Sequence, residues 1–234
     1  PSYSGGGGRE RVVLHLVPNR WAAEKTLAAW PDVPCFIIGD PTLDDSLRTH
    51  LDLTDPEGPG KDADVGMDGF VAAVTFHWDA SAVAPEAGTG WHVWAYPVLQ
   101  LARQDDIRVI GHAHPRIAHQ LGPWWAEHGI EYVPDRDRIL QRADVLVADN
   151  TSLIWQAARL GIGVVVLDCP FYGPDAARHG PPRFDRHADV GVRVTDPADR
   201  AAAVRRAASL PATVAHECET IAADGSEEHT SERV

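Results

Sequence analysis

Residues 144–168, DVLVADNTSLIWQAARLGIGVVVLD, contain the pattern that decides the fold of this chain. The apolar run 145–148 has the length of a buried strand, and 164–167 is a second run of the same kind. Between the two runs, 151–160 has the composition of a helix. The stretch therefore predicts a strand, a turn at 149–152, a helix and a second strand.

Apolar runs of the same kind recur along the chain and alternate with helical segments. Strands are expected at 71–76, 107–111, 132–133 and 190–194, and helices at 91–103, 116–128, 136–142 and 197–209. Continuous apolar runs suit strands that are covered on both faces, as in a parallel sheet. We therefore predict an α/β fold with a doubly wound, mostly parallel, Rossmann-like sheet, in which ligands bind beyond the carboxyl ends of the strands.

A separate β-α-β unit is predicted near the start of the chain. Strands at 12–17 and 35–38 flank a helix at 20–30 and follow a Gly-rich lead. The Gly-, Pro- and Asp-rich segment 52–68 has almost no apolar residues and marks the candidate domain boundary. We therefore expect a flexible lead with a β-α-β unit at 1–60, a Rossmann-like domain at 61–222 and a polar tail at 223–234.

The composition excludes several classes of partner. The chain carries 34 acidic and 21 basic residues, and its formal charge of −13 repels nucleic acids and anionic membranes. No apolar run approaches the roughly 20 residues that span a bilayer. Cys35, Cys169 and Cys218 are odd in number and far apart, which favours a reducing compartment, so we expect a cytoplasmic protein. Because the chain starts at Pro1 and not at Met, we also expect residues upstream of it.

The turn at 149–152 is the first candidate binding site, because it follows a strand and opens a helix. Asn150 is a good N-cap residue, and Thr151 and Ser152 bring two hydroxyls to the unpaired amides of the first helical turn. The partial positive charge of a helix N-terminus attracts phosphate without any Lys or Arg. We therefore predict that Asp149, Asn150, Thr151 and Ser152 bind phosphate. The alternative is that Asp149 and Asn150 only cap the helix.

A second candidate site lies at 111–116, in the sequence GHAHPR, directly after a predicted strand. A histidine beside a phosphate can donate a hydrogen bond to it or transfer a proton. We predict that His114 is the catalytic residue and that Arg116, which opens the next helix, is a phosphate ligand. The alternative is that His114 and Pro115 only end the strand and start the helix.

Two loops supply further candidate residues. His77 comes directly after one strand, and the loop beyond it holds Glu86, Gly88 and Thr89. These four residues form a candidate cleft loop, although the composition fits an ordinary surface loop better. Arg183 lies on a loop of about twenty residues, and loops of that length are typically functional or disordered. Its arginines and aromatic residues suit a base or a phosphate, or they cover the core.

The segment ADVLVADNTSLIWQAARLGIGVVVLD at 143–168 resembles the activated-donor site of GT-B transferases. The likeness is strongest to the CDP-glycerol glycerophosphotransferase-like group. That group typically has an aspartate, one further residue, two Ser or Thr residues and a helix, and Asp149, Thr151 and Ser152 fall on this pattern. The second pair is Thr-Ser instead of two serines, which keeps both hydroxyls.

Two other parts of the chain extend the resemblance. The group carries a His-Pro after an upstream strand, which His114 and Pro115 match. The sequence CFIIGDPTLD at 35–44 resembles the end of the N-terminal half of a GT-B enzyme. In total the resemblance covers about 70–210, which corresponds to the C-terminal half that binds the activated donor. UDP-N-acetylglucosamine 2-epimerases share the same general layout.

The resemblance implies a transferase that moves a sugar or polyol-phosphate group from a nucleotide-activated donor to an acceptor, without a metal or another cofactor. Thr151 and Ser152 would hold the phosphate of the activated donor. His114, with Arg116 and Arg183, would stabilise the charge of the leaving group. Most of an N-terminal acceptor domain is absent, so a missing domain or a partner chain is expected to supply it. The alternatives are a UDP-sugar 2-epimerase and a non-catalytic nucleotide- or glycan-binding module.

Overall fold

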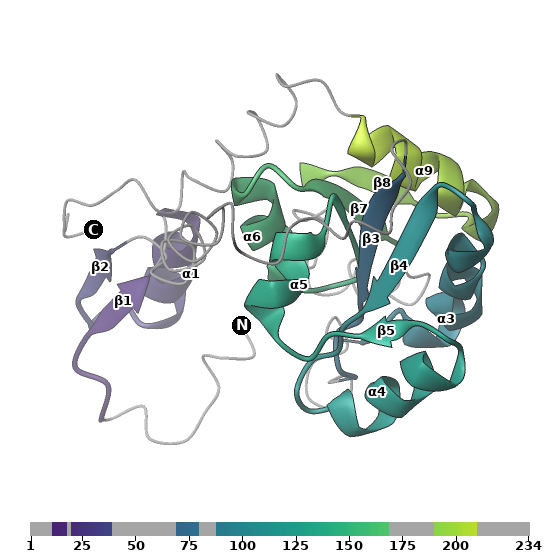
Figure 1. Ribbon diagram of the computed structural model, residues 1–234. Coiled ribbons are helices and arrows are strands. Elements are labelled where there is room, and N and C mark those ends of the chain that lie inside the picture. Colours follow the sequence, from purple (N-terminus) through teal and green to yellow (C-terminus); the bar gives the residue numbers. More distant parts are fainter. Residues whose placement is uncertain (1–10, 18–19, 39–68, 80–87, 169–189, 210–234) are drawn as a thin grey trace, which may run out of the picture.

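The computed structural model describes residues 11–17, 20–38, 69–79, 88–168 and 190–209. Its main part is a six-stranded sheet, in which all five pairs of neighbouring strands are parallel (Figure 1). The strands are β3 (Phe70–Thr75), β4 (Ile107–Gly111), β5 (Glu131–Tyr132), β6 (Val145–Ala148), β7 (Gly163–Leu167) and β8 (Val192–Val194). They lie in the order β5-β4-β3-β6-β7-β8, so the predicted doubly wound α/β fold is confirmed.

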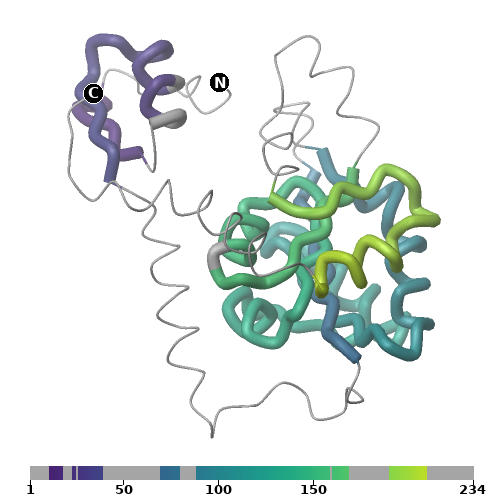
Figure 2. The backbone as a smooth tube through the Cα atoms, turned by 90° about the horizontal axis from the view of Figure 1, so that it is seen from above, coloured from purple at the N-terminus to yellow at the C-terminus, as the bar shows by residue number. Residues whose placement is uncertain are grey.

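Helices cover both faces of this sheet, as Figure 1 shows and as Figure 2 shows from above. One face packs on α3 (Trp91–Leu99), α4 (Ala118–Glu127) and α9 (Arg200–Ala208), and the other packs on α5 (Arg136–Arg142) and α6 (Leu153–Arg159). Successive residues of β3 alternate between the two hydrophobic clusters: Ala72 and Val74 face α3 and α4, whereas Val71 and Ala73 face α5 and α6. Burial on both faces explains why the strands are continuously apolar.

Five predicted helices differ at their ends from the observed ones, and three of the differences are at turns of another kind. The helix expected at 91–103 stops at Leu99, and a short 3-10 turn, η4 (Leu101–Arg103), completes it. The helix expected at 197–209 begins with the 3-10 turn η6 (Pro197–Asp199), in which the Asp196 carboxylate accepts a hydrogen bond from the Ala198 amide. The helix expected at 151–160 starts at Leu153, because the chain forms a tight turn first.

A two-stranded parallel sheet with one helix forms the predicted N-terminal β-α-β unit. It consists of β1 (His15–Val17), α1 (Arg20–Ala29) and β2 (Cys35–Ile37), so the first strand is shorter than the predicted 12–17. Val17 and Ile37 are buried in its small core, whereas Leu14, Leu16 and Ile38 are 42%, 58% and 37% exposed. The predicted boundary at 52–68, the Gly-rich lead and the polar tail lie outside the described residues.

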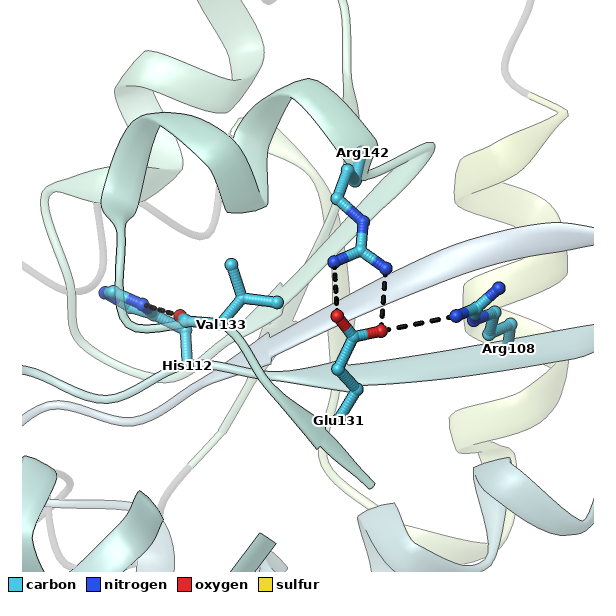
Figure 3. A network of polar contacts seen from close by, with 5 residues as sticks. All are labelled: Arg108, His112, Glu131, Val133 and Arg142. Carbon is cyan, nitrogen blue, oxygen red and sulfur yellow. Dashed lines mark hydrogen bonds and ion pairs between the residues drawn. The ribbon is translucent and has the colours of Figure 1, made fainter. Parts of the chain in front are cut away.

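The edge of the main sheet is fixed by one ion-pair network (Figure 3). Glu131, on the edge strand β5, accepts two hydrogen bonds of 2.7 Å from Arg142 at the end of α5. It also pairs with Arg108 of β4 at 3.2 Å. The hydrogen bonds from Arg142, and after them the charges of both arginines, lower the pKa of Glu131. The network therefore holds a strand of only two residues against its neighbour.

We predict that Gly111→Ala destabilises the chain by about 1–3 kcal/mol, because a Cβ at Gly111 would lie 2.4 Å from the buried Trp125 ring. Urea unfolding measures this cost. In a Trp125→Leu background, which opens space beside Gly111, the same substitution should cost markedly less, since residues in contact are coupled. An equal cost in both backgrounds would show that the contact does not limit the size of residue 111.

Candidate functional site

The candidate site lies where the strand order reverses. From β3 the chain continues through β4 to β5 on one side, and then returns to place β6, β7 and β8 on the other. In open parallel sheets, ligands bind beyond the carboxyl ends of the strands at such a switch point. Here the switch point lies between β3 and β6. His77 and Trp78 follow the first of these strands, and residues 149–152 follow the second.

Asp149 connects the loops that meet at this point. Its side chain is completely buried. One carboxylate oxygen accepts a hydrogen bond of 2.7 Å from the His77 amide after β3, and the other accepts one of 2.7 Å from the Gly90 amide at the start of α3. A Cβ at Gly90 would lie 3.0 Å from the Cβ of Asp149, so glycine permits the close approach. The predicted ligand residue Asp149 therefore lies beneath the surface of the site.

The electrostatic environment of Asp149 is unusual for an aspartate. Complete burial raises its pKa to about 6, although backbone hydrogen bonds from Gly90, His77 and Asn150 act in the opposite direction. A carboxylate that stays ionised at neutral pH in such a place costs stability, since only amides compensate its charge. Strongly perturbed carboxylates of this kind cluster at functional sites. The position of Asp149 at the switch point fits that pattern.

The turn after Asp149 differs from the prediction in one respect. Asn150 is not the N-cap of α6: the N-cap is Ser152, whose side chain makes no capping hydrogen bond. The Thr151 hydroxyl instead accepts a hydrogen bond of 3.3 Å from the Leu153 amide, which closes a turn and delays the helix. The Leu153 amide is already hydrogen-bonded to Thr151, and α6 is a short helix of seven residues. Phosphate binding here would therefore depend more on the hydroxyls than on the amides of the helix N-terminus.

His112 and His114 have different environments at the end of β4. His112 is 7% exposed, and its Nδ1 lies 2.9 Å from the Val133 carbonyl oxygen (Figure 3). Burial lowers the pKa of His112, and its contact with the Val133 carbonyl joins the end of β4 to the end of β5. His114 is half-buried and lies beyond the strand. Of these two histidines, the predicted site residue His114 is therefore the one that remains accessible.

An aromatic and basic cluster surrounds His114, and its members come from the ends of β3 and β4. The His114 ring centroid lies 6.0 Å from that of His77 and 6.1 Å from that of Trp78. The guanidinium carbon of Arg116 lies 4.2 Å from the centroid of the Trp78 ring, which is a cation–π contact. Among the described residues, no carboxylate lies within ion-pair distance of the Arg116 side chain.

The remaining predicted residues fall in different places. Thr89 is buried, and its hydroxyl accepts a hydrogen bond of 3.1 Å from the Trp91 amide, so it starts α3. Gly88 precedes it, next to the segment that Asp149 holds. Thr89 and Gly90, at the described end of this loop, are therefore buried. Glu86 and Arg183 lie outside the described residues.

Trp78 is the residue of the cluster that the sequence did not single out. Its only signal was its position immediately after His77, beyond a predicted strand. A tryptophan in that place is equally compatible with packing in the core. Its contact with Arg116 depends on the pairing of β3 with β4, which brings two loops from distant parts of the chain together.

Within the described ranges, no group of three or more His, Cys, Asp or Glu side chains gathers in a way that could hold a metal ion. The cluster around His114 offers hydrogen-bond donors and positive charge. Arg116 supplies a guanidinium, and His77 and His114 supply imidazoles. Thr151 and Ser152 supply hydroxyls after β6, the strand that pairs with β3. Such a set is suited to the oxygen atoms of phosphate groups.

The sequence matches no protein-family model and no curated protein. Several solved structures share its fold. The wall teichoic acid polymerase TagF soaked with CDPG superposes with a TM-score of 0.55 at 15% identity, over 92% of this chain and 52% of that one. A UDP-GlcNAc 2-epimerase from Neisseria meningitidis bound to UDP-GlcNAc gives a TM-score of 0.50 at 12% identity, over 88% of this chain and 55% of that one.

The α,α-trehalose 6-phosphate synthase from Burkholderia multivorans also superposes, with a TM-score of 0.51 at 10% identity, over 93% of this chain and 55% of the other. These structures have the GT-B fold, and the six-stranded sheet of this chain has the Rossmann-like arrangement that the resemblance implied. The chain spans slightly more than half of their length, between 52% and 55%.

We predict that the stability of the wild-type chain relative to Asp149→Asn falls as the pH rises from about 4 to about 7. The pKa of Asp149 in the folded chain, about 6, exceeds the ordinary 3.8. The stabilisation from this group is therefore fully present below pH 3.8 and is lost as the pH rises through about 6. Asparagine does not titrate. Over this pH range, the free energy of unfolding of the wild type relative to Asp149→Asn should fall by about 2–3 kcal/mol, as measured by urea unfolding. If the free energy of unfolding of the two chains depended on pH in the same way, the prediction would be contradicted.

Proposed function

We propose that this chain is the half of a GT-B-type transferase that binds a nucleotide-activated donor, a sugar or a polyol phosphate. The observation that carries the proposal is the position of Arg116. This cation has no carboxylate partner among the described residues, although the formal charge of the chain is −13. It lies beside His114 at the carboxyl end of the sheet. An uncompensated guanidinium there favours an anionic ligand.

In this proposal the phosphate groups of the activated donor lie between Arg116 and the turn that opens α6. The planar guanidinium matches the oxygen atoms of a phosphate and forms two hydrogen bonds at once. Thr151 and Ser152 contribute hydroxyls from the opposite strand of the switch point, next to Asn150. Asp149 does not touch the ligand: its carboxylate holds the neighbouring loops in register.

The transfer step creates negative charge on the leaving nucleotide. An oxygen atom of the acceptor hydroxyl forms a bond to the transferred group and releases its proton to a base on the acceptor side. At the same time the bond between the transferred group and a phosphate oxygen breaks, and that oxygen keeps the electron pair. A hydrogen bond from His114 to a phosphate oxygen stabilises this charge, and loss of one such hydrogen-bond donor typically costs about 2–4 kcal/mol of barrier. Arg116 acts on the same charge. Arg183 is a further candidate from the sequence for this role.

The choice of reaction rests on the turn at 150–152. A nucleotide-activated sugar is bound in the epimerase structure, and a polymerase soaked with CDPG has the same fold, so this fold is compatible with both ligands. Epimerases typically have Ser-Gly-Gly where this chain has Asn150, Thr151 and Ser152. We therefore favour a transferase, and a UDP-sugar 2-epimerase is the second enzyme candidate.

The acceptor half is proposed to pack on a face of the N-terminal unit whose described apolar side chains are exposed. Leu16 of β1, Leu14 before it and Ile38 after β2 are exposed, whereas Val17 and Ile37 pack with Ala23 of α1. Strands of a parallel sheet are normally covered on both faces, and a two-stranded sheet is marginal by itself. The occupant we propose is an α/β segment with an amphipathic helix. A non-catalytic nucleotide- or glycan-binding module that assembles with such a segment is the alternative.

A cytoplasmic location is proposed from the sequence. The three cysteines form no disulfide spacing, and Cys35 is a free, buried thiol. Of the helices in the described ranges, none has the length and apolar character needed to cross a membrane. The activated donor and an acceptor of unknown identity are the proposed partners, and the charge of −13 argues against nucleic acid.

We predict that Arg116→Ala weakens binding of the activated donor by about 10- to 100-fold, because a hydrogen bond to a charged group contributes about 1.5–3 kcal/mol. Calorimetric titration with CDP-, UDP- and GDP-linked donors measures the affinity. Arg103→Ala is the matched control, since Arg103 is an exposed arginine that precedes β4 and lies at the opposite end of the sheet. The control should bind like the wild type.

The double substitution Thr151→Val and Ser152→Ala should weaken the same binding by about tenfold, since each neutral hydrogen bond contributes about 0.5–1.5 kcal/mol. Thermal shift with saturating activated donor gives an independent measure, because a ligand that binds only the folded state stabilises it. If no nucleotide raised the melting temperature of the chain, both enzyme candidates would be contradicted. Binding without turnover in the presence of an acceptor half would favour the binding module.

A further inference from the structure

The loop after β4 contains a hydrogen bond that determines how His114 can act. The backbone amide of Arg116 donates to Nδ1 of His114 at 3.2 Å, and the Ile117 amide donates to the His114 carbonyl oxygen at 2.9 Å. A backbone N–H can only donate, so Nδ1 must present its lone pair. In a neutral imidazole with Nδ1 as the acceptor, the proton is on Nε2.

The charges around His114 oppose a second proton on its ring. Arg116 follows two residues later on the same loop, and His112 lies at the end of β4. The ring of His77, from the end of β3, is an aromatic neighbour at 6.0 Å. Burial lowers the pKa of His114, and the charges of Arg116 and His112 lower it further. A proton on Nδ1 would also remove the acceptor of the Arg116 amide. The geometry and the charges therefore favour the same state of the ring.

Trp78 holds the guanidinium in this position. The Arg116 side chain is exposed, yet its guanidinium carbon lies 4.2 Å from the centroid of the Trp78 ring. The loop that carries Trp78 is fixed in turn, because the His77 amide donates to the buried carboxylate of Asp149 at 2.7 Å. A long side chain that would otherwise move freely in solvent thus stays beside the histidine.

We infer that Arg116 and Trp78 are positioning residues, which keep His114 as a neutral imidazole with its proton on Nε2, so that His114 serves as a hydrogen-bond donor and not as a base. The identity of the acceptor, an oxygen of a phosphate, rests on the proposed function. The state of the ring does not, because it follows from contacts within the ligand-free chain. No proton needs to leave His114 for this role.

Nitrogen NMR of the full chain with labelled histidine tests the inference directly. The spectrum of His114→Gln identifies the His114 signals among those of the twelve histidines. In the wild type at neutral pH we expect a protonated Nε2 and an unprotonated Nδ1. In Arg116→Met the pKa of His114 should rise, and in Trp78→Leu it should rise less. Arg103→Met, at the amino end of β4, should leave it unchanged.

A His114 ring that carries its proton on Nδ1, or that is doubly protonated at neutral pH, would overturn the inference. An unchanged pKa in Arg116→Met would overturn the part assigned to Arg116. Because the substitutions are on exposed or half-buried side chains, we expect each variant to fold, and the near-ultraviolet circular dichroism of each one verifies this.

Binding of the activated donor separates this inference from the proposed function. His114→Gln places an amide near the position of Nε2 and should bind within about threefold of the wild type, whereas His114→Asn places it near Nδ1 and should lose about tenfold. If the NMR result is as expected but both variants bind like the wild type, the inference about the ring stands and the role of His114 in the proposed function fails.

Discussion

The arrangement of the site depends on the carboxylate of Asp149, which joins the ends of three elements. Asp149 follows β6, and its two oxygens accept amides from the segment after β3 and from the start of α3. At the other end of the same strand pair, Asp144 accepts the Val71 amide at 2.9 Å. The strands on either side of the switch point are therefore joined by an aspartate at each end. The first of these bonds sets the position of Trp78, and through it that of Arg116.

The buried carboxylate of Asp149 carries a cost in stability. The pKa of Asp149 is raised to about 6 by burial, so its ionised form at neutral pH is held against a desolvation penalty. A buried pair of apolar side chains would avoid that penalty, but it would not fix two backbone amides in direction. Asp149 therefore fixes the positions of the two neighbouring loops. Accurate positions matter most where groups from separate strands must act on one ligand.

The sequence predicted the fold well because burial on both faces leaves a direct mark, as the apolar runs at 107–111 and 145–148 show. It also located His114, since a polar residue after a buried strand must lie at the carboxyl edge. It misjudged Asn150 as an N-cap, because the turn made by the Thr151 hydroxyl depends on local geometry that composition does not encode. Trp78 was missed because its partner, Arg116, is brought to it only by strand pairing.

The central claim is that the carboxyl ends of β3, β4 and β6 together bind the phosphate groups of a nucleotide-activated donor. A crystal structure of the chain with a nucleoside diphosphate tests it most directly. The account predicts phosphate oxygens within hydrogen-bond distance of the Arg116 guanidinium, the His114 Nε2 atom and the hydroxyl of Thr151 or Ser152. A nucleotide bound at the amino ends of the strands, or at the carboxyl edge without contact to Arg116 and His114, would contradict it.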